Sequence, residues 1–107
     1  MLHKMKLQER PFNRMKSGEK KVEFRLYDEK RQQIKIGDQI EFSKLPDLEE
    51  KLLVEVIDLY RDTTFNSLFK KLFTDEKEIE RKTQSMYTIY SPEEEAKYGV
   101  LGIRVQI

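Results

Sequence analysis

The sequence predicts an α+β domain in which a small curved or closed β-sheet is flanked by helices. Runs of strand type recur at residues 20–27, 34–42, 52–60 and 100–107. Helical segments with their own start and stop signals fall between these runs at irregular intervals, unlike the regular alternation of an α/β protein. A length of 107 residues makes one domain spanning 1–107 the expected organisation.

The first predicted element is a helix that begins near Glu9. Pro11 suits a first helical turn, and Phe12 and Met15 are spaced to face inward together. Gly18 stands where a helix end needs a residue of left-handed conformation.

Residues 20–27 then alternate between apolar and polar, as a half-buried strand does. The apolar face carries Val22, Phe24 and Leu26, and the opposite face carries Lys21, Glu23, Arg25 and Tyr27. A polar turn follows at 28–33, and residues 34–42 are predicted to be a strand interrupted at Gly37-Asp38. Residues 43–51 form a loop, and 52–60 form a long apolar strand.

The spacing of the apolar residues changes at residues 63–73, where five large apolar side chains fall at helical spacing after a threonine that can cap the helix. Such an aromatic stripe predicts core packing. Residues 74–82 have few apolar side chains and predict a solvated helical turn or loop. Ser91, Pro92 and Glu94 begin a last helix with a capping box, Gly99 ends it, and 100–107 close the chain as a strand.

Composition excludes several classes of function. The chain has no cysteine and one histidine, His3, so neither a disulfide framework, nor a thiolate or histidine metal site, nor a histidine-dependent triad is available. We expect no cofactor. No apolar run approaches a membrane span and no signal-peptide pattern opens the chain, which predicts a cytoplasmic protein without a membrane partner.

The net charge of +1 conceals an asymmetry. Residues 1–45 carry 12 Lys and Arg against 7 Asp and Glu, whereas residues 46–107 carry 9 against 13. The first half can attract an anion or a phosphate backbone, although charges that merely coat a small surface give the same count. A total near zero argues against strong non-specific binding to a duplex.

The charged strand gathers residue types that suit recognition. Arg25 offers a planar fork for phosphate, carboxylate or a base edge, and Glu23 can accept from an exocyclic amine or act as a base. Lys20 can hold an anion at the mouth of the strand. The alternative is ordinary ion pairing on a solvated strand face, worth a few tenths of a kcal/mol.

These residues also carry a resemblance to a known family. The stretch PFNRMKSGEKKVEFRLY resembles the opening of an ASCH domain, a branch of the PUA-like β-barrel superfamily, whose Gly-x-Lys-x-x-Glu-x-Arg motif is matched at Gly18, Lys20, Glu23 and Arg25. IKIGDQIEF and YSPEEEAKYGVLGIRVQI resemble later segments of compact bacterial and archaeal members, so nearly the whole chain is covered. The resemblance implies a PUA-like barrel, a role in RNA metabolism, and a cleft for RNA or a nucleobase that Lys20, Glu23 and Arg25 line and Gly18 shapes.

The resemblance leaves enzymatic activity open. One branch of the family comprises small amidohydrolases that act on acetylated cytidine, with a threonine nucleophile three residues after the lysine. This chain has Glu23 there, which is a poor replacement for a hydroxyl that must be acylated. A further catalytic glutamate of that branch aligns loosely with residues 75–80, where Glu76, Glu78 and Glu80 are candidates.

Three tyrosines complete the candidate site. Tyr27 follows the motif on the Glu23 face and is placed to stack on a base, or to pack on Arg25 as a rim residue. Of Tyr87 and Tyr90, we expect one to pack on the barrel and the other to border the cleft. Ser91 is interpreted as a helix cap and not as a nucleophile.

Three hypotheses follow. The first is a module that binds single-stranded RNA or a modified nucleobase through Gly18, Lys20, Glu23, Arg25 and Tyr27. The second is a small hydrolase of a modified nucleoside or of RNA, with Lys20 and Glu23 in the chemistry. The third is a protein-interaction domain whose acidic second half recruits a basic partner. Each is compatible with a monomer or a weak dimer.

Overall fold

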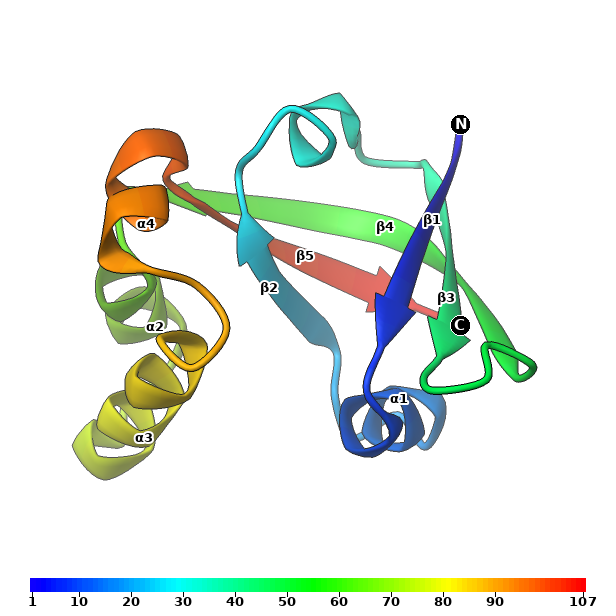
Figure 1. Ribbon diagram of the computed structural model, residues 1–107, viewed down its shortest axis with the longest axis horizontal. Coiled ribbons are helices and arrows are strands. Elements are labelled where there is room, and N and C mark those ends of the chain that lie inside the picture. The colour runs from blue at the N-terminus through cyan, green and yellow to red at the C-terminus, as the bar shows by residue number, and fades with distance from the viewer. The chain divides into compact units, whose positions relative to one another are not determined.

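The computed structural model describes residues 1–107 and has the predicted α+β fold (Figure 1). The elements, in chain order, are β1 (Leu2–Leu7), α1 (Glu9–Lys16), β2 (Val22–Leu26), a short 3-10 helix (Arg31–Gln33), β3 (Gln39–Lys44), β4 (Lys51–Asp62), α2 (Phe65–Leu72), α3 (Glu76–Met86), α4 (Pro92–Tyr98) and β5 (Val100–Gln106). The strands form one mixed sheet in the order β1-β3-β4-β5-β2. β1 is parallel to β3, and β3 is antiparallel to β4.

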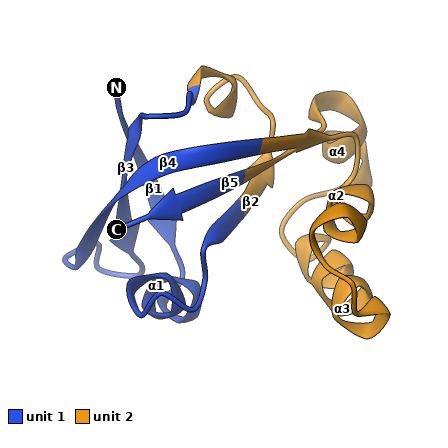
Figure 2. Cartoon of the chain, turned by 180° about the vertical axis from the view of Figure 1, so that it is seen from behind, with its two compact units in different colours: residues 1–23, 34–59, 103–107 blue, residues 24–33, 60–102 orange.

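The chain divides into two compact units (Figure 2). The first comprises residues 1–23, 34–59 and 103–107, and the second comprises residues 24–33 and 60–102. That the chain works as one domain stays a prediction.

The first unit contains β1, α1, β3, most of β4 and the end of β5. Leu2 to Leu7 pair in register with Gln39 to Lys44, and Ile40 pairs with Val54. Alternate side chains of these strands are buried together with one face of α1, as strand and helix periodicity require. The buried apolar side chains of this unit include Met5, Leu7, Phe12, Met15, Ile40, Phe42, Leu52, Val54, Val56, Ile103 and Val105.

β1 was not predicted from the sequence. The buried positions of this strand are His3, Met5 and Leu7. Because the first of them is a histidine, the strand lacks a regular alternation of apolar and polar residues. The imidazole is buried and its Nε2 lies 2.8 Å from Oδ2 of Asp38, so a hydrogen bond compensates for its burial.

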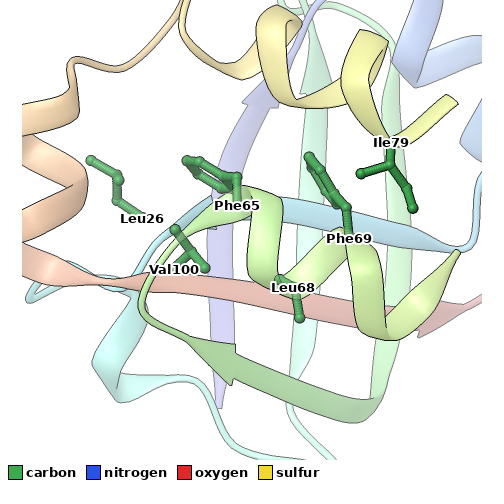
Figure 3. Close-up of a cluster of buried hydrophobic side chains, with 6 residues drawn as sticks. All are labelled: Leu26, Phe65, Leu68, Phe69, Ile79 and Val100. Carbon is green, nitrogen blue, oxygen red and sulfur yellow. The ribbon is translucent and has the colours of Figure 1, made fainter. Parts of the chain in front are cut away.

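The second unit is built around the aromatic stripe of α2, which packs as core (Figure 3). Leu68 and Phe69 of α2 are buried with Ile79 of α3 and with residues from β2 and β5. The rings of Phe65 and Phe69 stack with their centroids 6.1 Å apart. Thr64 caps α2 by accepting from the Ser67 N–H at 3.1 Å, as predicted.

Three sequence predictions are corrected. Residues 34–36 are not part of a strand, because β3 begins only at Gln39, beyond the Gly37 turn. Residues 76–86 form the full helix α3, which Asp75 caps and whose few apolar side chains include the buried Ile79. Glu23 is buried, although simple alternation in β2 placed it on the outward face.

The predicted end of the chain is confirmed. Ser91 caps α4 with the full capping box, in which its hydroxyl accepts from the Glu94 N–H and the Glu94 carboxylate accepts from the Ser91 N–H. Gly99 follows with a positive φ of 72°, and β5 begins at Val100.

Candidate functional site

The end of α1 sets the position of Lys20. Gly18 has a φ of +86°, a left-handed conformation that glycine adopts without strain, and it turns the chain directly after the helix. The Gly18 N–H donates to the Met15 carbonyl at 3.1 Å, and the Lys20 N–H donates to the Arg14 carbonyl at 3.0 Å. The turn is therefore fixed at both ends to α1, and Lys20 starts from a defined backbone position.

Lys20 and Glu23 form an ion pair. Nζ of Lys20 lies 3.1 Å from Oε1 of Glu23, and the two side chains are 21% and 6% exposed. A buried carboxylate is costly unless a charge or a hydrogen-bond donor lies beside it, so the contact accounts for the inward position of Glu23. Two residues of the motif are thus brought together where a ligand can reach the lysine.

A cavity of about 370 Å³ opens in the first unit beside Lys20. Its lining combines cations with apolar side chains; it comprises Met15, Gly18, Lys20, Lys21, Ile57, Arg104, Val105, Gln106 and Ile107. The volume lies at the lower end of the range for small-molecule sites. Three cationic side chains beside apolar ones suit an anionic ligand with a flat or apolar body.

The remaining two residues of the predicted site belong to the second unit. Arg25 is half-buried on β2, and Tyr27 is half-buried just after it. The Tyr27 ring carries the Arg61 guanidinium above it, with the guanidinium carbon 3.9 Å from the ring centroid. The structure therefore places Gly18, Lys20 and Glu23 together in the first unit, whereas Arg25 and Tyr27 belong to the second unit.

The acidic candidates of the second half lie on α3. Glu76 and Glu80 line a cavity of about 610 Å³ between α2 and α3, and Glu78 lies 3.8 Å from Lys82 in an ion pair. None of the three is selected as a catalytic group by its contacts.

The two later tyrosines have structural partners within the second unit. The Tyr90 ring stacks on Phe65 with centroids 5.8 Å apart. The Tyr87 hydroxyl donates to Oε1 of the buried Glu95 at 2.7 Å, and this hydrogen bond raises the pKa of Tyr87 above its ordinary value. Tyr90 thus packs, as expected for one of the two, while a role of Tyr87 at a cleft stays a prediction.

Two arginines that the sequence analysis did not single out lie at the sites described above. Arg104 is the one charged residue within the apolar run of β5, and that interruption is the signal that marks it in the sequence. Arg61 gives no such signal, because its stacking on Tyr27 joins residues from distant parts of the chain.

Asp38, in the first unit, has a carboxyl group whose pKa is lowered by its neighbours. The hydrogen bond from His3, helped by the Lys35 N–H, lowers the pKa of Asp38 to about 2. The carboxylate is therefore ionised at neutral pH and ties β1 to the turn before β3. We interpret this cluster as structural.

No helix is both long and apolar enough to span a membrane.

Comparison with known proteins identifies the class. Residues 5–107 match the ASCH domain family, so the chain belongs to that family. The fold is accordingly the PUA-like α+β fold that the motif predicted. No curated protein matches the chain significantly.

Solved structures agree with this assignment. The crystal structure of hypothetical protein PH0355 matches with a TM-score of 0.84 and 34% identity, over 99% of this chain and 98% of that one. The solution structure of protein PF0455 from Pyrococcus furiosus matches with a TM-score of 0.74 and 37% identity, over 99% and 96%. ZmASCH from Zymomonas mobilis, solved as an S128A mutant, shares the fold with a TM-score of 0.66 at 13% identity, over 99% of this chain and 68% of that one.

Proposed function

We propose that this ASCH domain binds single-stranded RNA or an unpaired nucleobase at the cavity beside the Gly18–Lys20 turn. The observation that carries the proposal is the position of Lys20, which lines the cavity and lies 3.1 Å from the buried Glu23 carboxylate. A cation next to a fixed carboxylate offers a donor for phosphate and an acceptor for an exocyclic amine.

Two further features support nucleic acid as the ligand. Lys21 and Arg104 add two cations to the same cavity, and the exposed Ile57 supplies an apolar surface on which a base can lie. Membership of the ASCH family points in the same direction. Arg25, from the same motif, lies in the second unit, and its contact with RNA stays a prediction that is independent of this cavity.

The test is RNA binding by wild-type protein and by variants of the cavity, measured by fluorescence anisotropy with a labelled mixed-sequence oligoribonucleotide. Lys20→Gln, Lys21→Gln and Arg104→Gln each remove one charge from the cavity. We expect each to weaken binding by roughly threefold to tenfold, and to reduce the salt dependence by about one phosphate contact.

Lys35→Gln is the matched control. It removes the same charge from an exposed position of the first unit that does not line the cavity. If Lys35→Gln weakens binding as much as Lys20→Gln does, the effect is one of net charge and the proposed site is wrong.

A second candidate function is hydrolysis of a modified nucleoside. It is favoured by the Lys20–Glu23 contact, since an amine and a carboxylate 3.1 Å apart can exchange a proton and activate a water molecule. Incubation with acetylated cytidine, followed by NMR detection of acetate, tests it. Acetate released by wild type and not by Glu23→Gln would make the domain an enzyme, whereas release that survives both Lys20→Ala and Glu23→Ala would exclude these residues from the chemistry.

A further inference from the structure

Arg61, near the end of β4, lies over an aromatic ring. Its guanidinium carbon lies 3.9 Å from the centroid of the Tyr27 ring, within the distance of a strong cation–π contact. The side chain is exposed, whereas Tyr27 beneath it is half-buried. Arg61 is therefore accessible to a ligand while its guanidinium lies over the ring.

The guanidinium donors of Arg61 have no partner in the chain. The guanidinium lies over the Tyr27 ring and makes no hydrogen bond or ion pair. Arg31, in the same unit, shows the usual alternative, since its Nη1 donates to Oδ2 of Asp28 at 3.1 Å. An arginine that is positioned by a ring and keeps its five N–H donors available has the form of a binding group.

The platform beneath Arg61 is anchored at its backbone. The Tyr27 N–H donates to the Gly99 carbonyl at 3.0 Å, and the Tyr27 carbonyl accepts from Nε2 of Gln32 at 3.0 Å. Both backbone groups of Tyr27 are thus fixed, and the ring in turn limits the rotamers of Arg61. A ligand that binds here loses less side-chain entropy than on a mobile arginine.

We propose that the Arg61–Tyr27 stack is a binding site for an unpaired nucleobase of single-stranded RNA, which lies on the outer face of the guanidinium. Unpaired bases stack on arginine planes as they do on aromatic rings. The carboxylates that flank the stack in sequence, Asp28 and Asp62, are paired with Arg31 at 3.1 Å and with Lys71 at 2.9 Å, so neither engages the Arg61 guanidinium. The inference rests on the proposed RNA binding, and adds a contact in the second unit that the motif does not contain.

The test compares Arg61→Ala and Arg61→Lys with wild type in anisotropy titrations of labelled oligoadenosine and oligouridine over a series of salt concentrations. Arg61→Ala should weaken binding of oligoadenosine about fivefold or more, and that of oligouridine less, because adenine stacks more strongly. Arg61→Lys should recover little of the affinity for oligoadenosine, because lysine retains the charge but lacks the plane on which a base stacks.

Arg81→Ala is the matched control, since Arg81 is an exposed arginine of α3 in the same unit. Wild-type affinity in Arg61→Lys would reduce Arg61 to a charge contact and overturn the proposal. Equal losses in Arg61→Ala and Arg81→Ala would also overturn it. Circular dichroism of each variant establishes that it is folded.

A second readout separates this inference from the proposed function. Adenosine, which carries no phosphate, is titrated while the Arg61 Nε–H and Tyr27 ring resonances are followed by NMR. Shifts of these resonances support the base site even if RNA fails to bind at the Lys20 cavity. Their absence at millimolar adenosine overturns the inference, and leaves RNA binding to be judged by the Lys20 variants alone.

Discussion

Replacing Glu95 by alanine should destabilise the second unit more than any other single change on α4. Glu95 is 5% exposed, and its carboxylate joins three separate segments. Oε2 accepts from the Phe65 N–H at the start of α2 at 2.8 Å, and Oε1 accepts from the Tyr87 hydroxyl after α3 at 2.7 Å. The Phe65 N–H belongs to the first turn of a helix, where a negative charge is also favoured by the helix dipole.

The magnitude follows from these two hydrogen bonds. Hydrogen bonds to a charged group contribute roughly 1.5–3 kcal/mol each, and a buried N–H without a partner carries a similar penalty. Removal of the buried charge returns part of its desolvation cost, so we expect Glu95→Ala to lower the free energy of unfolding by about 3 kcal/mol. Glu95→Gln keeps the shape and one acceptor, and should cost about 1 kcal/mol.

Urea unfolding followed by circular dichroism measures these differences, with Glu93→Ala as the matched control. Glu93 is exposed on the same helix, so its replacement should change the stability by at most about 0.5 kcal/mol. Tyr87→Phe should cost about 1 kcal/mol, and little more when it is combined with Glu95→Ala, because both changes remove the same bond. Equal stability of the Glu95→Ala and Glu93→Ala proteins would refute the reasoning.

The same bond predicts a pH effect on the alkaline side. Because Glu95 raises the pKa of Tyr87, the folded chain retains a proton that the unfolded chain loses near pH 10. The stabilisation is therefore present below pH 10, and is lost as the pH rises above it. Absorbance titration of the tyrosines should show one late-titrating phenol that Tyr87→Phe removes; no change in the late phase on that substitution would contradict the assignment.

Three further predictions concern the fold. Gly99→Ala should destabilise by roughly 1–2 kcal/mol more than Gly18→Ala in urea unfolding, since both have positive φ but a Cβ at Gly99 would lie 3.0 Å from the Asp62 carbonyl oxygen; equal losses would contradict this. Lys71 and other donors lower the pKa of Asp62 to about 2. The stabilisation that the ionised Asp62 contributes should therefore be fully present above about pH 4, and be lost as the pH falls through about 2. An NMR titration of that carboxylate with a midpoint near 4 would exclude the effect. Thr64→Ala should lower the free energy of unfolding by about 1 kcal/mol in thermal melts, because it removes the cap of α2. Thr64→Ser retains the hydroxyl and should leave the stability unchanged.

Local patterns predicted much of the secondary structure. The residues from Pro11 to Gly18 specify α1 and its end, and the Ser91 capping box specifies α4, because the signals for these helices lie within a few residues of each other. The long strand at 52–60 was likewise found inside β4. The elements that were missed or shortened carry polar residues at inward positions, as His3 does in β1 and Thr83 in α3.

The candidate site was predicted as a motif and only partly as a geometry. Gly18, Lys20 and Glu23 are close in sequence, and the structure brings the lysine and the carboxylate into contact. Alternation placed Glu23 outward, because the pattern of a single strand contains no information on what covers its polar face. Arg104 is marked in the sequence by its interruption of the apolar run of β5, but no local pattern indicates that it shares a cavity with Lys20.

The sequence by itself determined the α+β class, the caps of the helices and the family motif, since these depend on residue types within one or two turns of chain. The tertiary structure decided which side chains contact one another. It joined Asp38 to His3, Glu95 to Phe65 and Tyr87, and Arg61 to Tyr27, over separations that no propensity or periodicity encodes. The physical reason is that burial of a charge or a ring is compensated by whichever complementary group the folded backbone brings beside it, and that group is fixed only when the strands and helices have packed.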